Sequence, residues 1–490
     1  MLGTAHVLAA AAILLLTALH PARAIAADGA PPSKAAKGKP LHAFSWEPPA
    51  PGVENITGFI WIDLSDDPKA RHPYASSPEK TAERSRRLPD GCAAVFIWKG
   101  HDVLDHPEDC TRGPDGALTK FQSPWLDHGV ARVKARVTAF FTAFKQAGGR
   151  LDYLVLDYEG GLSNWCMKPG QVDAIFADPR AAALKTSLGF GSASALQDCS
   201  PPPYSLGDDL VAAVAKGDKP YMKWNRSMYS MLCTALNAAV YGPVKELFPR
   251  ARASNYGHAA VSDTTVILDG NGHMETGHSG CFGNRGSREF YGLRQLRSRK
   301  LLSGKEYGAQ PFDSLRWLLN NMRGFHRSSN VPFSPWVSHK SWPGDAAFDY
   351  CLADNDYYQE LLYHLALMEA DDFLLWNPAP WHSGQALKEF RKEADDLLVD
   401  ACVRVLNQKL GSRPRRCITP QDIPWDSSLL VTGMQLGDDR VLWRVSVPRW
   451  DAKVKVLPSG DVLTTGKFVG LWYESLPGQD ISFELVPPAR

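Results

Sequence analysis

Short apolar runs, rich in β-branched and aromatic residues, recur from about residue 55 to residue 410 and alternate with stretches of helical periodicity. The runs predict strands at residues 58–64, 93–98, 151–157, 252–256, 264–269, 333–337 and 372–376. The stretches between them predict helices at 129–146, 228–247, 311–327, 355–370 and 386–408. Alternation of this kind is typical of parallel strands joined by crossover helices.

The number of predicted strands and the length of chain that holds them favour an α/β fold, a (β/α)8 TIM barrel with long loops over residues 55–410. No glycine-rich dinucleotide or P-loop motif follows a predicted strand. We therefore expect neither a dinucleotide nor a nucleoside triphosphate at the ends of these strands.

The C-terminal residues 427–490 have a different pattern. Strand-like runs are separated by turns that contain Gly, Pro and Asp, and no helical periodicity intervenes. This pattern predicts a small antiparallel β-sandwich domain after the barrel.

The N-terminus reads as an export signal. Residues 7–19 are apolar except for Thr17, and small-x-small triplets follow them. The run is too short to span a bilayer, so residues 1–26 are predicted to be a signal peptide and residues 27–54 a leader. The mature protein is then secreted or periplasmic, with no membrane association after cleavage. Because the first six residues contain no Lys or Arg, a membrane anchor is the alternative.

The charge of the chain bears on its binding partners, and its cysteine content bears on possible disulfides. Lys and Arg number 54 against 53 Asp and Glu, which argues against a nucleic-acid partner. The nine cysteines can pair in an oxidising compartment, although an odd number leaves at least one out. Pairs that are near in sequence are the candidates, without a fixed connectivity: Cys92 with Cys110, Cys166 with Cys199, and Cys402 with Cys417.

The segment 151–161, LDYLVLDYEGG, carries the candidate chemistry. Asp157 and Glu159 are two residues apart at the end of an apolar strand, so alternation places both on one face. Two carboxylates this close do not both ionise freely, and one of them then has a raised pKa, as a general acid requires. We expect Glu159 to be the general acid and Asp157 to stay ionised. The alternative is that both acids cap loop amides above the barrel.

Residues 153–159, YLVLDYE, resemble the strand-end Asp-x-Glu of secreted TIM-barrel glycoside hydrolases, including chitinase-like and hyaluronidase-like enzymes. Residues 247–250 and 254–257 are similar to the hyaluronidase pattern of a Pro-basic turn followed by a strand that ends in Tyr-Gly. Residues 358–370 and 372–377 are similar to the last helix and strand, where a Trp floors the sugar subsite. The resemblance implies a distant glycosidase.

The chain also departs from these families. Val155 replaces a further Asp of the chitinase-type strand, and residues 160–162 lack the Glu, Trp and Arg of hyaluronidases. A Tyr of a later strand is replaced by Trp336 or Ser338. These differences argue against catalysis assisted by an N-acetyl group and favour a conventional pair of carboxylates. The candidates for the partner carboxylate are Asp63, Asp269 and Glu369.

Aromatic residues at the predicted strand ends are candidates for sugar binding, since indole rings stack on the flat faces of sugars. We expect substrate contacts from Trp61, Trp98, Trp336, Trp376, Tyr158, Tyr256 and Asn377. For any single Trp, a place in the core is the alternative.

No cofactor or metal is expected. His273, Glu275 and His278 lie in a loop-like segment whose spacing fits no helical metal motif, and no CxxC or nucleophile-elbow motif occurs. The sequence therefore predicts a glycoside hydrolase acting on a carbohydrate substrate by general-acid catalysis. The alternatives are a carbohydrate-binding protein without turnover and a metal hydrolase acting through His273 and His278.

Overall fold

The computed structural model divides the chain into two units, Met1–Ala35 and Ala36–Arg490, of which the first lies outside the described residues. The structure describes residues 38–64, 74–98, 104–158, 170–196, 220–257, 299–300, 306–307, 334–337, 339–341, 351–352, 355–375, 377, 391–418, 429–447, 452–465 and 470–486.

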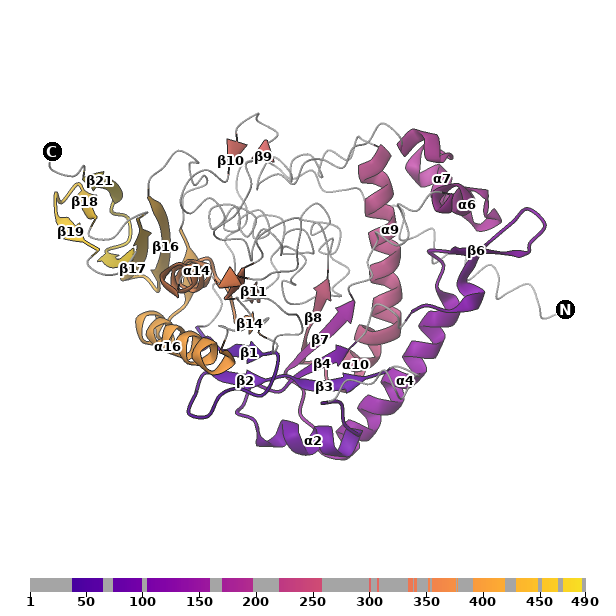
Figure 1. The fold of residues 1–490 in the computed structure, drawn as a ribbon, viewed down its shortest axis with the longest axis horizontal. Coiled ribbons are helices and arrows are strands. Elements are labelled where there is room, and N and C mark those ends of the chain that lie inside the picture. The colour runs from indigo at the N-terminus through magenta and orange to yellow at the C-terminus, as the bar shows by residue number, and fades with distance from the viewer. Residues whose placement is uncertain are drawn as a thin grey trace. The chain divides into compact units, whose positions relative to one another are not determined.

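Two four-stranded sheets, parallel throughout, form the centre of the second unit (Figure 1). One has the order β3 (Ile60–Asp63), β4 (Ala94–Trp98), β7 (Tyr153–Tyr158) and β8 (Arg252–Gly257). The other has the order β11 (Trp336–Val337), β14 (Phe373–Leu375), β1 (Ala43–Ser45) and β2 (Ile56–Gly58). Only Phe59 separates β2 from β3, so one extended segment contributes to both sheets.

Helices connect and cover these strands. They are α2 (Pro78–Arg87), α4 (Asp127–Gln146), α6 (Gln171–Ala177), α7 (Ala182–Leu188), α9 (Pro220–Leu236), α10 (Gly242–Leu247), α14 (Asn355–Leu367) and α16 (Lys392–Leu410). Shorter turns are the 3-10 helices η2 (Pro107–Asp109), η3 (Pro179–Ala181) and η4 (Ala193–Leu196) and the π-helix η5 (Asn237–Tyr241). Two-stranded antiparallel pairs are β5 (Cys110–Arg112) with β6 (Leu118–Gln122), β9 (Arg299–Lys300) with β10 (Glu306–Tyr307), and β12 (Lys340–Ser341) with β13 (Cys351–Leu352).

Each strand of the β3–β4–β7 group buries both of its faces. Ile62, Ile97 and Leu156 belong to a cluster that includes apolar residues of α4 and α9. Trp61 and Phe96, one position earlier on their strands, belong to a separate aromatic cluster on the opposite face. Strands covered on both sides read as continuous apolar runs, which is why the sequence marks these strands so clearly.

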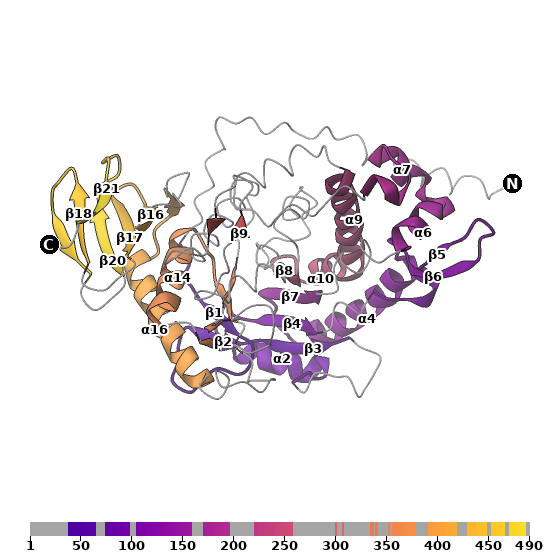
Figure 2. The same cartoon turned by 45° about the horizontal axis from the view of Figure 1, so that its top comes forward.

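The C-terminal residues form two antiparallel sheets (Figure 2). The first has the order β15 (Arg415–Cys417), β16 (Leu430–Leu436), β17 (Arg440–Ser446) and β20 (Gly470–Ser475), and the second β19 (Val462–Thr464), β18 (Lys453–Leu457) and β21 (Ser482–Val486). Val445 of β17 and Val454 of β18 share one buried cluster, so the two sheets pack on each other. Leu442 of β17 instead packs with α14 and α16.

The N-terminal boundary of the sheet differs from the predicted leader. β1 lies within residues 27–54 and pairs with both β2 and β14, with its three residues buried. The strand is only three residues long, too short for its period to stand out in the sequence. The strand predicted at 264–269 and the helix predicted at 311–327 lie outside the described residues. Within the described part of the chain, no helix is both long and apolar enough to cross a membrane.

Two of the expected disulfides are not formed. Cys92 and Cys110 are free thiols, and so is Cys402, which excludes the Cys92–Cys110 and Cys402–Cys417 bridges. Cys92 precedes β4, whereas Cys110 is the first residue of β5, which follows β4 in the chain. Burial raises the pKa of the Cys92 thiol to about 11, so it stays protonated and unreactive at neutral pH. Cys166 and Cys199 lie outside the described residues.

Charged groups gather where the strands begin. Asp372, which directly precedes β14, is buried and forms an ion pair with the half-exposed Lys39. Arg252, the first residue of β8, lies 3.4 Å from the neighbouring Asp371 carboxylate. Burial raises the pKa of Asp372 to about 6, because the loss of hydration disfavours its charged form more than Lys39 favours it.

We expect Asp372 to lower the stability of the protein as the pH rises from about 4 to about 6. The folded state has the higher pKa and binds the proton more tightly, so the stabilisation is complete below the unfolded-state value and is lost through about 6. Two pKa units correspond to at most about 3 kcal/mol. Urea unfolding of the wild type and Asp372→Asn at several pH values measures this. As the pH rises through this range, the unfolding free energy of the wild type should fall relative to that of Asp372→Asn. A difference in unfolding free energy that does not change with pH would contradict the raised pKa of Asp372.

Candidate active site

The carboxyl ends of four adjacent parallel strands place the candidate residues in one row. Asp63 at the end of β3 is in register with Trp98 at the end of β4. On β7, Leu156 pairs with Ile97, so Asp157 is level with Trp98, and Asp157 pairs in turn with Tyr256 of β8. Residues in register on parallel strands share a face. Asp63, Trp98, Asp157 and Tyr256 therefore occupy successive positions of one row.

The face of this row follows from the alternation along each strand. Trp61 and Phe96, two residues before Asp63 and Trp98, belong to the aromatic cluster, as does Val155, two residues before Asp157. Asp63 and Trp98 are thus one layer above this cluster, and Asp157 and Tyr256 hold the matching positions of β7 and β8 at the carboxyl edge of the sheet. Tyr158 is the last residue of β7 and pairs with Gly257. Glu159 lies outside the described residues.

Trp61 fills the core instead of offering a sugar platform. Its side chain is 1% exposed, and its indole N–H donates a 2.9 Å hydrogen bond to the carbonyl of Trp46. Its ring lies 4.8 Å from that of Trp46 and 4.4 Å from that of Phe96. The prediction that Trp61 contacts substrate is therefore wrong, because the residue lies one layer below the strand end.

Trp98 lies one layer higher and is only partly buried. Its ring makes edge-on contacts with Trp46 at 6.0 Å and with Trp61 at 5.7 Å. These contacts fix the orientation of the indole while part of its surface stays accessible. The backbone of Trp336 belongs to β11. The side chain of Trp336 and the whole of Trp376 lie outside the described part of the chain.

Asn377 is a structural residue and not a substrate ligand. Its carbonyl oxygen accepts hydrogen bonds from the Ser45 hydroxyl at 3.0 Å and the Trp46 backbone N–H at 3.3 Å. Its amide nitrogen donates to the carboxylates of Asp395 and Asp396, both at 2.9 Å. These four bonds use the full hydrogen-bonding capacity of an amide. The side chain is buried, so the predicted substrate contact is wrong.

The Asn377 network joins segments far apart in the chain. Asp396, near the start of α16, also accepts from the Ala50 backbone N–H at 2.8 Å and pairs with Lys392. Asp395 lies 3.7 Å from His339, whose ring stacks on Tyr358 at 5.0 Å. Sequence reasoning missed Trp46 and this acidic pair. An aromatic residue just after a very short strand and two adjacent acids at a helix start were the available signals.

We expect Asn377→Ala to destabilise the protein by about 1–3 kcal/mol, since it leaves buried carboxylate oxygens without their donors. The free energy of unfolding in urea measures this. Gln408→Ala, which removes an exposed amide from α16, is the matched control and should change stability by less than about 0.5 kcal/mol. Equal effects of the two substitutions would show that the network contributes nothing.

The candidates for the partner carboxylate of the Asp157–Glu159 pair lie at different edges of the sheets. Asp63 is in the row itself, two strands from Asp157. Glu369 is at the opposite edge, between α14 and β14, where its carboxylate accepts a hydrogen bond from the Cys417 backbone N–H. Glu369 is therefore excluded as a partner. Asp269, His273, Glu275 and His278 lie outside the described residues.

Comparisons with known proteins give only remote likenesses. No protein family and no curated protein matches the chain. A β-L-arabinopyranosidase of glycoside hydrolase family 27 from Geobacillus stearothermophilus aligns over 92% of this chain and 97% of its own, at 9% identity and a TM-score of 0.38. A structure described as a glycoside hydrolase aligns over 90% and 89%, at 11% identity and 0.34. An endo-β-1,6-glucanase aligns over 86% and 82%, at 10% identity and 0.35. These neighbours are glycoside hydrolases, but TM-scores this low do not establish a shared fold or activity.

Proposed function

We propose that the protein is an exported glycoside hydrolase that cleaves a poly- or oligosaccharide by general-acid catalysis. Glu159 is the general acid in this proposal, and Asp157 is the ionised carboxylate beside it. The observation that carries the proposal is the row of Asp63, Trp98, Asp157 and Tyr256 at the carboxyl ends of four neighbouring strands. Carboxylates beside an aromatic platform are the groups that glycosidic cleavage needs.

The proposal includes a (β/α)8 barrel with a C-terminal β-sandwich. The strands follow the order of the chain within each parallel sheet, β1–β2 in one and β3–β4–β7–β8 in the other, with β5–β6 as a separate pair, and β1 pairs on its other side with the late strand β14. Pairing of the first strand with the last is what closes a barrel. In barrels of this kind, active sites are built at the carboxyl ends of the strands, where the row lies.

Asp63 is our proposed partner carboxylate across the row. Two inter-strand spacings place its backbone about 10 Å from that of Asp157. Two carboxyl groups extending from these positions can flank one glycosidic bond. The aromatic cluster below them keeps water out from that side, which strengthens the electrostatic effect of each carboxylate on a developing charge.

Trp98 and Tyr256 are our proposed substrate contacts in the row, with Tyr158 beside them, and Trp336 and Trp376 remain proposed from the sequence. The near-neutral charge of the chain suits an uncharged sugar polymer, whose capture needs no electrostatic steering. Export through the predicted signal peptide would place the enzyme where such polymers are found.

Assay of the purified protein against a panel of neutral glycans tests the proposal. Reducing-end release is measured together with calorimetric binding of the same glycans. Release from at least one glycan is the expected result. Binding without release would instead support a carbohydrate-binding protein that has lost turnover. Neither binding nor release across the panel would contradict both functions.

A further inference from the structure

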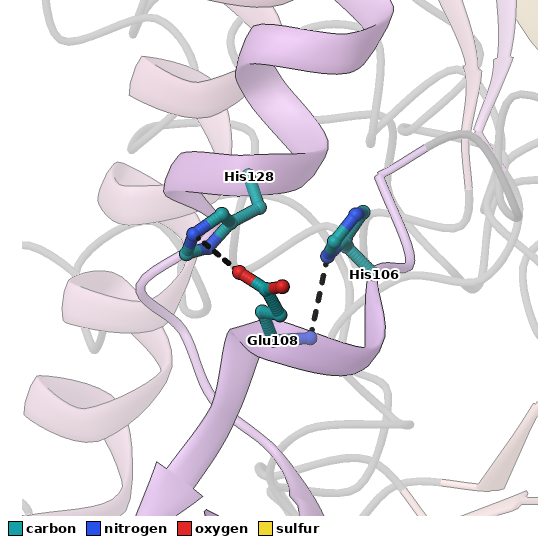
Figure 3. A group of neighbouring side chains, drawn as sticks. All are labelled: His106, Glu108 and His128. Carbon is teal, nitrogen blue, oxygen red and sulfur yellow. Dashed lines mark hydrogen bonds and ion pairs between the residues drawn. The ribbon is translucent and has the colours of Figure 1, made fainter.

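A group of side chains outside the proposed active site has the composition of a transition-metal site. His106 and Glu108 belong to the turn around η2, and His128 is in the first turn of α4 (Figure 3). One ligand atom from each residue lies within 4.8 Å of the other two. We propose that His106, Glu108 and His128 bind Zn²⁺ and thereby fasten the connection between β4 and α4 to the helix.

His128 is oriented as a metal ligand is. Its Nδ1 lies 3.1 Å from Oδ1 of Asp109, a buried carboxylate that also accepts hydrogen bonds from the backbone N–H groups of His128 and Gly129. Asp109 is therefore fixed at the start of α4, and an Nδ1–H donated to it leaves the Nε2 lone pair for a metal ion. A carboxylate behind a ligating histidine is the usual second layer of a zinc site.

Glu108 faces this nitrogen, and His106 lies beside the pair. Oε2 of Glu108 is 2.8 Å from Nε2 of His128, the distance of an ion pair or hydrogen bond, so a metal ion would take the place of the proton between these two atoms. Ligands of tetrahedral zinc are about 3.3 Å apart, so the pair needs to open by only about half an ångström. Nδ1 of His106 accepts a 3.2 Å hydrogen bond from the Glu108 backbone N–H, so its lone pair is directed at that N–H in the absence of a metal ion.

Binding requires one adjustment. The two imidazole rings are stacked, with centroids 5.3 Å apart and planes 17° from parallel, and a metal ion cannot lie in both planes. The His106 ring, which is partly exposed, must rotate and exchange its long hydrogen bond for the metal. Two imidazoles and one carboxylate favour Zn²⁺ over Mg²⁺ or Ca²⁺, which prefer oxygen ligands. Water would complete the tetrahedron.

The sequence gives no sign of this site, because the ligands are two and twenty positions apart and match no metal motif. Its location explains what a metal would do there. The segment from residue 99 to residue 126 leaves the carboxyl end of β4 and includes the β5–β6 pair before it reaches α4. Zn²⁺ would hold the middle of this connection against the first turn of the helix. The proposal is independent of the proposed hydrolase activity.

Calorimetric titration of the untagged, metal-stripped protein with ZnCl₂ is the test. The wild type should bind one Zn²⁺ at this site and neither Mg²⁺ nor Ca²⁺, and its unfolding temperature should rise with Zn²⁺. Glu108→Gln and His128→Gln should each weaken this binding by at least about tenfold. Asp127→Asn removes an exposed carboxylate next to His128 that is not a ligand, so it should bind like the wild type.

Substitution of Co²⁺ gives a second readout, since tetrahedral Co²⁺ with nitrogen and oxygen ligands absorbs strongly in the visible. The band should be present in the wild type and in Asp127→Asn and absent from the other two variants, whose folding is checked by circular dichroism. Absence of Zn²⁺ binding by the wild type would overturn the proposal. Equal binding by all four proteins would assign the metal to other side chains and overturn it as well.

Discussion

Glu159→Gln is expected to reduce hydrolysis of natural glycans by about 10²–10⁴-fold, the contribution of a general acid. The amide keeps the size of the side chain but has no proton to give to the leaving oxygen. The loss should therefore be much smaller for aryl glycosides with a good leaving group, which depart without protonation. The alkaline limb of the pH profile, which reports the acid, should disappear in the variant.

The matched control is Glu484→Gln, the same chemical change on an exposed position of β21, which should leave kcat/KM unchanged. Asp157→Asn and Asp63→Asn extend the test to the other carboxylates of the row. Both should lower the rate on aryl glycosides as well, because an ionised carboxylate stabilises the transition state whatever the leaving group. Normal cleavage of natural glycans by Glu159→Gln would remove this residue from the mechanism.

Arg444→Met is expected to cost about 3–5 kcal/mol of unfolding free energy, the range for breaking a buried ion pair on one side. Arg444 of β17 and Glu360 of α14 are both buried, and the Arg444 Nε donates to Glu360 at 2.8 Å. The guanidinium also lies 4.8 Å from the ring centroids of both Tyr363 and Trp472. Its removal leaves the Glu360 carboxylate without the guanidinium that neutralises it. This carboxylate is buried between α14 and the C-terminal sheet.

A double-mutant cycle with Glu360→Leu separates the pair from its surroundings. The double variant should be more stable than Arg444→Met alone, because it removes the orphaned charge. Arg413→Met is the control, since Arg413 forms an exposed ion pair with Asp439 at 2.8 Å and should lose at most about 1 kcal/mol. Urea unfolding measures all of these. If both arginine substitutions cost the same, the buried pair has no special role in joining α14 to the sheet.

Several elements of the fold could be predicted because their signal is local. The strands β3, β4 and β14 lie within predicted runs, β7 extends one residue past its run, and α4 begins two residues before its predicted start. A strand buried on both faces needs apolar residues at successive positions, whatever the rest of the chain does. β1 was missed because three residues carry no period.

The candidate site was predictable only in part. The strand-end position of Asp157 follows from the pattern of β7 alone, but its neighbours do not. That Asp63, Trp98 and Tyr256 are level with it depends on the register of three strand pairs. A one-residue shift in any of them would move every position to the other face. Trp61 and Trp98 have similar sequence surroundings, and only their layer decides which one is buried.

By itself, the sequence determined the alternation of strands and helices, the position of Asp157 near the end of a strand and the near-neutral charge of the chain. The tertiary structure decided which side chains are buried and hydrogen-bonded within the protein and therefore cannot contact a ligand. Asn377 bonds to Ser45, 332 positions away in the chain, and Cys402 is a free thiol despite a cysteine nearby in sequence. Periodicity is a property of neighbouring residues, whereas exposure and hydrogen-bond partners depend on segments that meet only in the folded chain.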